Sequence, residues 1–79
     1  MFYAYVIRSI NFKYYYKGHC ENLRERLDQH NSGMTKSIRK YSPFEIAYFE
    51  TYDTRIEAIE REKYFKSAAG RRFLKNKLL

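Results

Sequence analysis

Two tyrosine-bearing segments, an arginine, a histidine and a glutamate are the residues of this sequence that could act together on a phosphate ester. The tyrosines stand in Tyr3-Ala4-Tyr5 and Tyr16-Lys17-Gly18, and they are followed by Arg26, His30 and Glu62. An arginine can neutralise phosphate oxygens, and a carboxylate can bind a divalent metal ion. Tyrosine and histidine can exchange protons with water. Together, these residue types are suited to hydrolysing a phosphodiester bond.

Arg26 and His30 fall in a predicted helix over residues 23–32. Successive residues of an α-helix turn by about 100°, so Leu23 and Leu27 lie on one face and define its buried direction. Arg26 flanks that face, and His30 falls between Arg26 and Leu23 around the helix axis. A structural role is the alternative for each residue, because imidazolium is favoured near a helix C-terminus and arginines are common on surfaces.

Glu62 is unusual in its predicted helix because it lies in the middle of an apolar arc. That arc is formed by Ala58, Phe65 and Ala69. A carboxylate in such a position needs a cation, a metal ion or hydrogen bonds, or its pKa rises. The alternative is a surface ion pair with Lys66, one helical turn further along the chain.

Strand alternation would bring the tyrosines onto shared faces. It places Tyr5 on the same face as Tyr3 and Ile7, and Tyr16 on the same face as Gly18. The chain has nine tyrosines, so ordinary core packing is the alternative role for Tyr5 and Tyr16.

The sequence predicts three strands and three helices around these residues. Aromatic and β-branched runs indicate the strands, and apolar residues three and four apart indicate the helices. In chain order, the elements are strands 2–8 and 14–18, a helix over 23–32, a strand over 45–52, and helices over 55–68 and 71–78. The order β-β-α-β-α-α predicts an α+β fold, in which a small three-stranded antiparallel sheet is flanked by helices.

Capping residues and glycines predict where the helices begin and end. Asn22 and Thr54 are each followed three residues later by a glutamate, which is typical of a helix N-cap. Gly33 and Gly70 predict the ends of the first two helices. Residues 33–44 predict a basic loop.

Length and cysteine usage limit the class of protein. The chain has 79 residues, so we expect one domain over 1–79. Cys20 is the single cysteine, which excludes a disulfide within the chain and suits a reducing compartment. The N-terminal run lacks the features of a signal peptide, and no stretch is long enough to span a membrane. We therefore predict a cytoplasmic protein.

The charge is strongly positive and unevenly distributed. The formal net charge is +7 and the isoelectric point is about 9.6. Residues 33–44 and 63–79 contain basic side chains and no acidic ones. This segregation favours a polyanionic partner, with nucleic acid first and an anionic membrane surface second. The alternative is a solvated basic surface without a specific partner.

The order and spacing of the candidate residues resemble the GIY-YIG nuclease family over nearly the whole chain, and most closely its small stand-alone bacterial members. Ten residues separate Tyr3-Ala4-Tyr5 from Tyr16-Lys17-Gly18, which resembles the motif pair that names the family. Arg26 and His30 follow at the spacing of the family's arginine and its histidine or tyrosine. Glu62 stands where the family has its metal-binding glutamate.

Two departures from the family pattern concern the motifs themselves. Tyr3 and Ala4 replace the first two letters of the first motif, and the bulk of Tyr3 raises the question of how wide the pocket is. Lys17 replaces the apolar middle residue of the second motif. By strand alternation, Lys17 is predicted to point away from the face of Tyr16.

The resemblance implies a metal-dependent endonuclease that hydrolyses phosphodiester bonds in DNA with one Mg²⁺ or Mn²⁺ ion. In the implied catalytic set, Glu62 binds the metal ion and Arg26 binds the phosphate. Either Tyr5 or Tyr16 accepts a proton from the attacking water. His30 orients groups or relays protons, and Asn76 forms hydrogen bonds within the site.

Basic residues outside the catalytic set would bind the nucleic-acid backbone, and their contacts would depend on salt and not on sequence. These residues are Lys36, Arg39, Lys40, Lys66, Arg71, Arg72, Lys75 and Lys77. DNA is the expected partner, with RNA left open. A monomer is expected, with a protein partner that supplies specificity as one option. A non-catalytic nucleic-acid-binding module with the same fold is the first alternative, and a basic protein-interaction or membrane-surface domain is the second.

Overall fold

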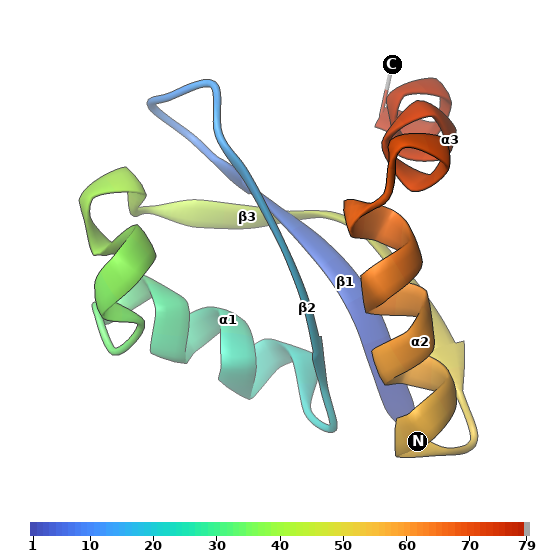
Figure 1. The fold of residues 1–79 in the computed structure, drawn as a ribbon. Helices are drawn as coiled ribbons and strands as arrows, with labels where there is room; N and C mark the ends of the chain where they lie inside the picture. The colour runs from blue at the N-terminus through green and yellow to red at the C-terminus, as the bar shows by residue number, and fades with distance from the viewer. Residues whose placement is uncertain (79) are drawn as a thin grey trace.

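The computed structural model describes residues 1–78 as three strands, three α-helices and one 3₁₀ helix. In chain order they are β1 (Phe2–Ser9), β2 (Tyr15–Cys20), α1 (Leu23–Asn31), η1 (Lys36–Tyr41), β3 (Phe44–Tyr52), α2 (Arg55–Lys66) and α3 (Ala68–Leu78). The predicted α+β class and the order of strands and α-helices are confirmed (Figure 1).

The sheet is antiparallel, with the strand order β2-β1-β3. Both neighbours of β1 are strands and both of its faces are covered, which is why the run from Ala4 to Ile7 is buried throughout. β2 and β3 are therefore edge strands. The outer edge of β2 faces no further strand in the described chain.

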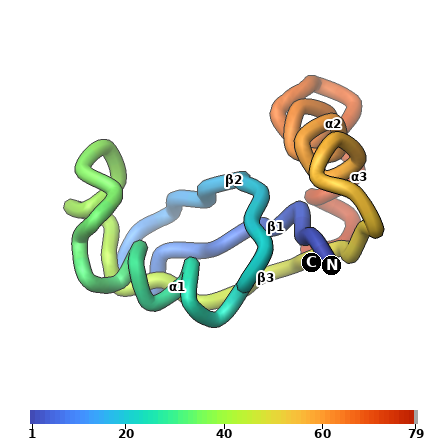
Figure 2. Tube along the Cα trace, turned by 90° about the horizontal axis from the view of Figure 1, so that it is seen from below, coloured from blue at the N-terminus to red at the C-terminus, as the bar shows by residue number. Residues whose placement is uncertain are grey.

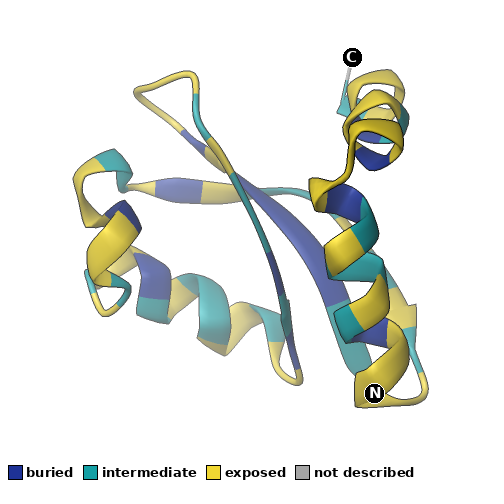
Figure 3. Ribbon diagram, viewed as in Figure 1, coloured by how far each residue is buried: buried dark blue, intermediate teal, exposed yellow. Residues whose placement is uncertain are grey.

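The helices cover the two faces of the sheet separately, and Figure 2 shows α1 and α2 on opposite sides of β2. Tyr5, Ile7 and Phe44 form one buried cluster beside α1 and η1. Val6 and Phe65 belong to the other cluster, beside α2 and α3. The predicted alternation is confirmed, because Tyr3, Tyr5 and Ile7 share the first cluster. Figure 3 shows the buried strand between exposed outer surfaces of the helices.

The prediction that Gly70 ends the second helix is wrong. α2 ends at Lys66, and the extended backbone of Ser67 separates it from α3. The Oγ of Ser67 accepts a hydrogen bond from the N–H of Gly70 at 3.0 Å, so Ser67 caps the next helix. Gly70 is buried inside α3, and a Cβ there would lie 1.7 Å from the carbonyl oxygen of Tyr64. Gly70 is required by close packing of the two helices and does not stop one.

Two other boundaries differ from prediction. β2 extends beyond Gly18 to Cys20 because these residues pair with Tyr3 and Ala4 of β1. The predicted basic loop contains η1, which is anchored by the buried side chain of Ile38.

The predicted N-caps are confirmed. The side chain of Asn22 accepts from the N–H of Glu25, and Thr54 forms a capping box with Glu57. None of the helices in residues 1–78 combines the length and the apolar character needed to span a membrane.

Candidate active site

Tyr5 lies in the middle of the central strand β1, where only 1% of it is exposed. Its register partner on β2 is Gly18. The ring of Tyr5 crosses the space that a side chain at Gly18 would occupy, and a Cβ there would lie 2.6 Å from the Oη of Tyr5. The glycine of the second motif is thus explained by packing, because it makes room for the ring.

His30 of α1 is fully buried and is hydrogen-bonded through both ring nitrogens. Its Nε2 lies 2.8 Å from the Oη of Tyr5, and its Nδ1 lies 2.8 Å from the Oγ1 of Thr35. A neutral imidazole carries one N–H, so it donates to one of these hydroxyls and accepts from the other. The contact fixes the orientation of the Tyr5 hydroxyl.

Burial determines the protonation states of His30 and Tyr5. It lowers the pKa of His30 to about 4, and the positive charge of Arg26 adds to the effect. Burial also raises the pKa of Tyr5, and this effect exceeds the opposing influence of Arg26. At neutral pH, His30 is therefore an uncharged imidazole and Tyr5 keeps its proton.

Arg26 lies beside this pair on α1 and is partly exposed. Its Nη1 donates to the Oε1 of Gln29 at 2.8 Å. No carboxylate of the described residues forms an ion pair with it. Arg26 also lines a surface depression of about 480 Å³ together with Cys20 and Glu25. Its charge is accordingly available to an anion that approaches from solvent.

Glu62 of α2 makes two short contacts that fix its carboxylate. Its Oε1 lies 2.6 Å from the Nδ1 of His19, and its Oε2 accepts from the Nζ of Lys66 at 2.7 Å. Burial alone would raise the pKa of Glu62, but the hydrogen bonds from Lys66 and His19 outweigh it and bring the pKa below its usual value. Glu62 is thus a carboxylate at neutral pH. The side chain is 18% exposed, so it remains accessible.

The candidate residues form two clusters on opposite faces of the sheet. The Tyr5 cluster (Tyr5, His30 and Arg26) lies on the α1 face, and the Glu62 cluster (Glu62, His19 and Lys66) lies on the α2 face. Neighbouring residues of a strand point to opposite faces. One ligand can therefore reach both clusters only around the free edge of β2.

Tyr16 lies on the α1 face of the sheet, beside the Tyr5 cluster. Its ring centroid is 5.1 Å from that of His30 and 6.5 Å from that of Tyr5. The edge strand β2 thus carries Tyr16 on the α1 face and His19, the partner of Glu62, on the α2 face.

The Glu62 cluster fits a divalent ion of a particular kind. Among residues 1–78, no group of three or more His, Cys, Asp or Glu side chains is arranged to hold a metal. Mg²⁺ needs fewer protein ligands, because it keeps several waters and usually binds one or two carboxylates plus substrate phosphates. The ionised Glu62 meets that requirement. A bound ion would have to replace Lys66 or His19 at one of its oxygens.

Of the predicted backbone-binding residues, Lys66 belongs to the Glu62 cluster, and the others lie on η1 and α3. Asn76 is exposed on α3 and shares no hydrogen bond with the other predicted catalytic residues of the described chain. Lys36, Arg39 and Lys40 belong to η1. Figure 1 shows η1 and α3 at opposite ends of the sheet, so the basic residues are split between two surfaces.

Sequence reasoning missed His19 and Thr35. His19 directly follows the second motif, and strand alternation places it on the face opposite Tyr16, where it meets α2. That signal was available from the strand pattern, but the partner Glu62 was not. Thr35 precedes η1 and carried no recognisable signal.

The sequence of the chain matches a known family. The model of the GIY-YIG catalytic domain matches residues 1–77. A UPF0213 protein of Pediococcus acidilactici is 30% identical over 77 residues, covering 94% of this chain and 78% of that protein. A UPF0213 protein of Pediococcus pentosaceus is 35% identical, and the match covers 82% of this chain and 68% of that protein. A UPF0213 protein of Clostridium perfringens is 34% identical, and the match covers 84% of this chain and 71% of that protein. No solved structure matches the chain.

Proposed function

This chain belongs to the family of GIY-YIG catalytic domains, and from that premise we propose that it is a metal-dependent endonuclease that hydrolyses phosphodiester bonds in DNA. The observation that supports this best is the position of Tyr16. Its ring centroid lies 5.1 Å from that of His30 on the α1 face, and on the same edge strand His19 contacts Glu62 on the α2 face. A phosphate at this edge of β2 would meet a guanidinium, a phenol and a carboxylate.

Each residue has a role that suits its surroundings. Arg26, which has no carboxylate partner in the described chain, would bind the phosphate oxygens and neutralise charge as it develops. Tyr5 keeps its proton and is held by His30, so it would position groups and not act as a base. Asn76 is retained as a predicted hydrogen-bonding residue.

Tyr16 is the better candidate for the proton acceptor. In the proposed step, the oxygen of a water attacks phosphorus, a proton of that water passes to the phenolate of Tyr16, and the bond from phosphorus to the leaving oxygen breaks. Tyr5 keeps its proton and is held by His30, which leaves Tyr16 as the tyrosine for this step.

Glu62 would hold the metal ion, either Mg²⁺ or Mn²⁺. When bound, such an ion polarises the phosphoryl oxygen and stabilises the leaving oxygen. His19 would orient Glu62 through the 2.6 Å contact of its Nδ1 with Oε1. Lys66 would move from Glu62 toward the phosphate, which is also an oxyanion.

A non-catalytic nucleic-acid-binding module is the second candidate, and one observation favours it. Both oxygens of Glu62 are already hydrogen-bonded, to His19 and Lys66, so the carboxylate is satisfied without a metal. This candidate predicts salt-dependent binding to nucleic acid and no cleavage under any metal condition.

The test is a cleavage assay on branched, nicked, single-stranded and duplex DNA, with an RNA strand as a further arm. Reactions contain Mg²⁺ or Mn²⁺ at low salt, and matched reactions contain a chelator. The Tyr16→Phe variant is assayed in parallel, because it keeps the ring and removes the hydroxyl. Cutting that requires metal and is lost in Tyr16→Phe supports the proposal. Binding without cutting would move the assignment to the second candidate.

A further inference from the structure

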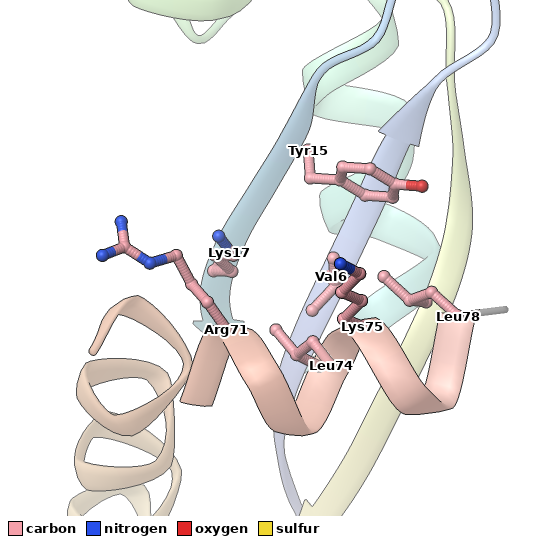
Figure 4. A pocket seen from close by; sticks show the side chains of 7 residues that line it. All are labelled: Val6, Tyr15, Lys17, Arg71, Leu74, Lys75 and Leu78. Atoms are coloured by element: carbon pink, nitrogen blue, oxygen red, sulfur yellow. The ribbon is translucent and has the colours of Figure 1, made fainter. Parts of the chain in front are cut away.

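A separate pocket lies on the α2 face of the sheet, between the sheet and α3, with a volume of about 230 Å³ (Figure 4). It is lined by Val6, Tyr15, Lys17, Arg71, Leu74, Lys75 and Leu78. These residues divide into an apolar part from β1 and α3, one aromatic ring and three cations. Arg71 and Lys75 are predicted to bind the nucleic-acid backbone, and the other lining residues have no role in the site described above.

The cations of the pocket have no acidic partner in the described chain. Lys17, Arg71 and Lys75 form no ion pair there, and no acidic residue lines the pocket. Burial lowers the pKa of Lys17, and the neighbouring charges of Arg71 and Lys66 lower it further. Mutual repulsion of this kind is relieved by a bound anion.

The apolar lining of the pocket limits the kinds of anion that fit it. A free phosphate would need the cations alone, whereas here they stand beside Val6, Leu74 and the ring of Tyr15. Tyr15 is 40% exposed on an edge strand, so part of its side chain is accessible to a ligand. A group with a flat apolar body and a phosphate satisfies both parts of the pocket. A nucleotide has this composition, and bases stack readily on aromatic rings.

The size and position of the pocket limit the class of ligand further. Pockets for drug-sized ligands typically hold ~300–1,000 Å³, so a pocket of about 230 Å³ suits one base and not a stacked pair. Lys17, which lines the pocket, lies two residues before His19 on the same face of β2, and His19 contacts Glu62 at 2.6 Å. The pocket is therefore next to the Glu62 cluster.

We propose that this pocket binds one unpaired nucleotide of the strand that is cut at the neighbouring Glu62 cluster, with the base on Tyr15 and its phosphates on Lys17, Arg71 and Lys75. The inference rests on the proposed function and names its substrate class. A base inside the pocket cannot remain paired in a duplex. The chain should accordingly prefer strands with an unpaired nucleotide to a continuous duplex.

The test measures binding by fluorescence anisotropy in chelator, so that no strand is cut. The probes are a short fluorescein-labelled DNA single strand and the blunt duplex of the same sequence. The variants are Tyr15→Ala and Tyr15→Phe, and the controls are Phe49→Ala and Lys63→Gln. Phe49 is 48% exposed on the other face of the sheet, and Lys63 is exposed on α2 outside the pocket. Circular dichroism checks that each variant is folded.

Loss of stacking should weaken binding of the single strand to Tyr15→Ala by about tenfold. Binding of the duplex should change by less than about twofold, because it depends on phosphate contacts. Tyr15→Phe should bind like the wild type, and both controls should too. The proposal would be overturned if Tyr15→Ala lost affinity equally for both probes, or if it lost no affinity for the single strand.

A second measurement does not depend on a variant folding. A single strand carrying 5-iododeoxyuridine is irradiated with the wild-type protein, and the crosslinked peptide is identified by mass spectrometry. Crosslinking at Tyr15 supports the pocket, and crosslinking only outside its lining residues overturns it. Both measurements are made without metal, so they report binding and not cleavage. If the protein fails to cleave DNA, the proposed function is contradicted, but the evidence for nucleotide binding in the pocket is unaffected.

Discussion

The ring of Tyr5 and the backbone of Gly18 are in direct contact across the β1–β2 ladder, and a Cβ on Gly18 would lie 2.6 Å from Oη and 2.7 Å from Cζ of that ring. The two halves of the motif pair are therefore one structural unit. Tyr5 fills the space that Gly18 leaves, and the filled space holds the hydroxyl against His30 at 2.8 Å.

Gly18→Ala should destabilise the protein by about 1–3 kcal/mol, which is typical for an added methyl group in a packed interior. Tyr5 is 1% exposed and held by His30, so its ring has little freedom to retreat. Urea denaturation measures the change in the free energy of unfolding. Lys17→Ala, at the adjacent position, is the control. A loss no larger than that of the control would contradict the packing role of Gly18.

The buried histidine should make stability depend on pH. The pKa of His30 is about 4 in the folded protein and near ~6.5 in the unfolded chain, which therefore binds more protons between these values. Its contribution is fully present above pH ~6.5, decreases as the pH falls, and is lost below about pH 4. The total loss is up to about 3 kcal/mol, at 1.36 kcal/mol for each pKa unit.

Urea denaturation between pH 4 and pH 7.5 tests this dependence. The comparison is with His30→Gln, whose side chain is polar and does not titrate. The wild type should lose stability more steeply than this variant as the pH falls. Parallel curves would show that His30 is not the group responsible.

His19 should support catalysis through Glu62. Loss of a residue that orients a metal ligand commonly costs 10–100-fold in activity or metal affinity, and His19→Ala should fall in that range. His19→Asn should recover part of the rate, because its amide N–H can replace Nδ1 at 2.6 Å from Oε1. Initial cleavage rates at several metal concentrations separate the two effects. Wild-type rates in His19→Ala would show that the contact has no role.

Basic residues at the two ends of the sheet should contribute to the salt dependence of DNA binding. Lys36→Gln on η1 and Arg72→Gln on α3 should each reduce the slope of log K against log[salt] by about 0.9, the value for one lost phosphate contact. The control is Arg55→Gln, because Arg55 lies 3.7 Å from Glu21 and over the ring of Phe2. An unchanged slope for one variant would exclude that end of the sheet from the interface.

Local patterns predicted the fold well because the local and tertiary requirements agree. Strand alternation placed Tyr3, Tyr5 and Ile7 on one face, and the capping pairs fixed the starts of α1 and α2. Gly70 shows where this agreement ends. The glycine is typical of a helix end, yet it is needed here because α3 passes the carbonyl of Tyr64 too closely for a Cβ.

The candidate site could be predicted only in part, because its contacts join distant segments. Glu62 was expected to need a partner, and the i,i+4 pair with Lys66 was one of the options. The second partner, His19, is 43 positions away in sequence, and only the packing of α2 on β2 brings it within 2.6 Å. The division of the residues between two faces likewise follows from strand alternation combined with the position of α2.

The most direct test of the central claim is metal-dependent cleavage by the wild type and by Glu62→Gln, purified in parallel and assayed on the same DNA panel. Glutamine keeps the size of the side chain and removes the charge that would hold the metal. We expect cleavage by the wild type to be abolished by chelator and reduced at least ~100-fold in the variant, with DNA binding retained. Equal cleavage by both proteins would contradict the assignment of Glu62, and DNA binding without cleavage by the wild type would contradict the nuclease itself.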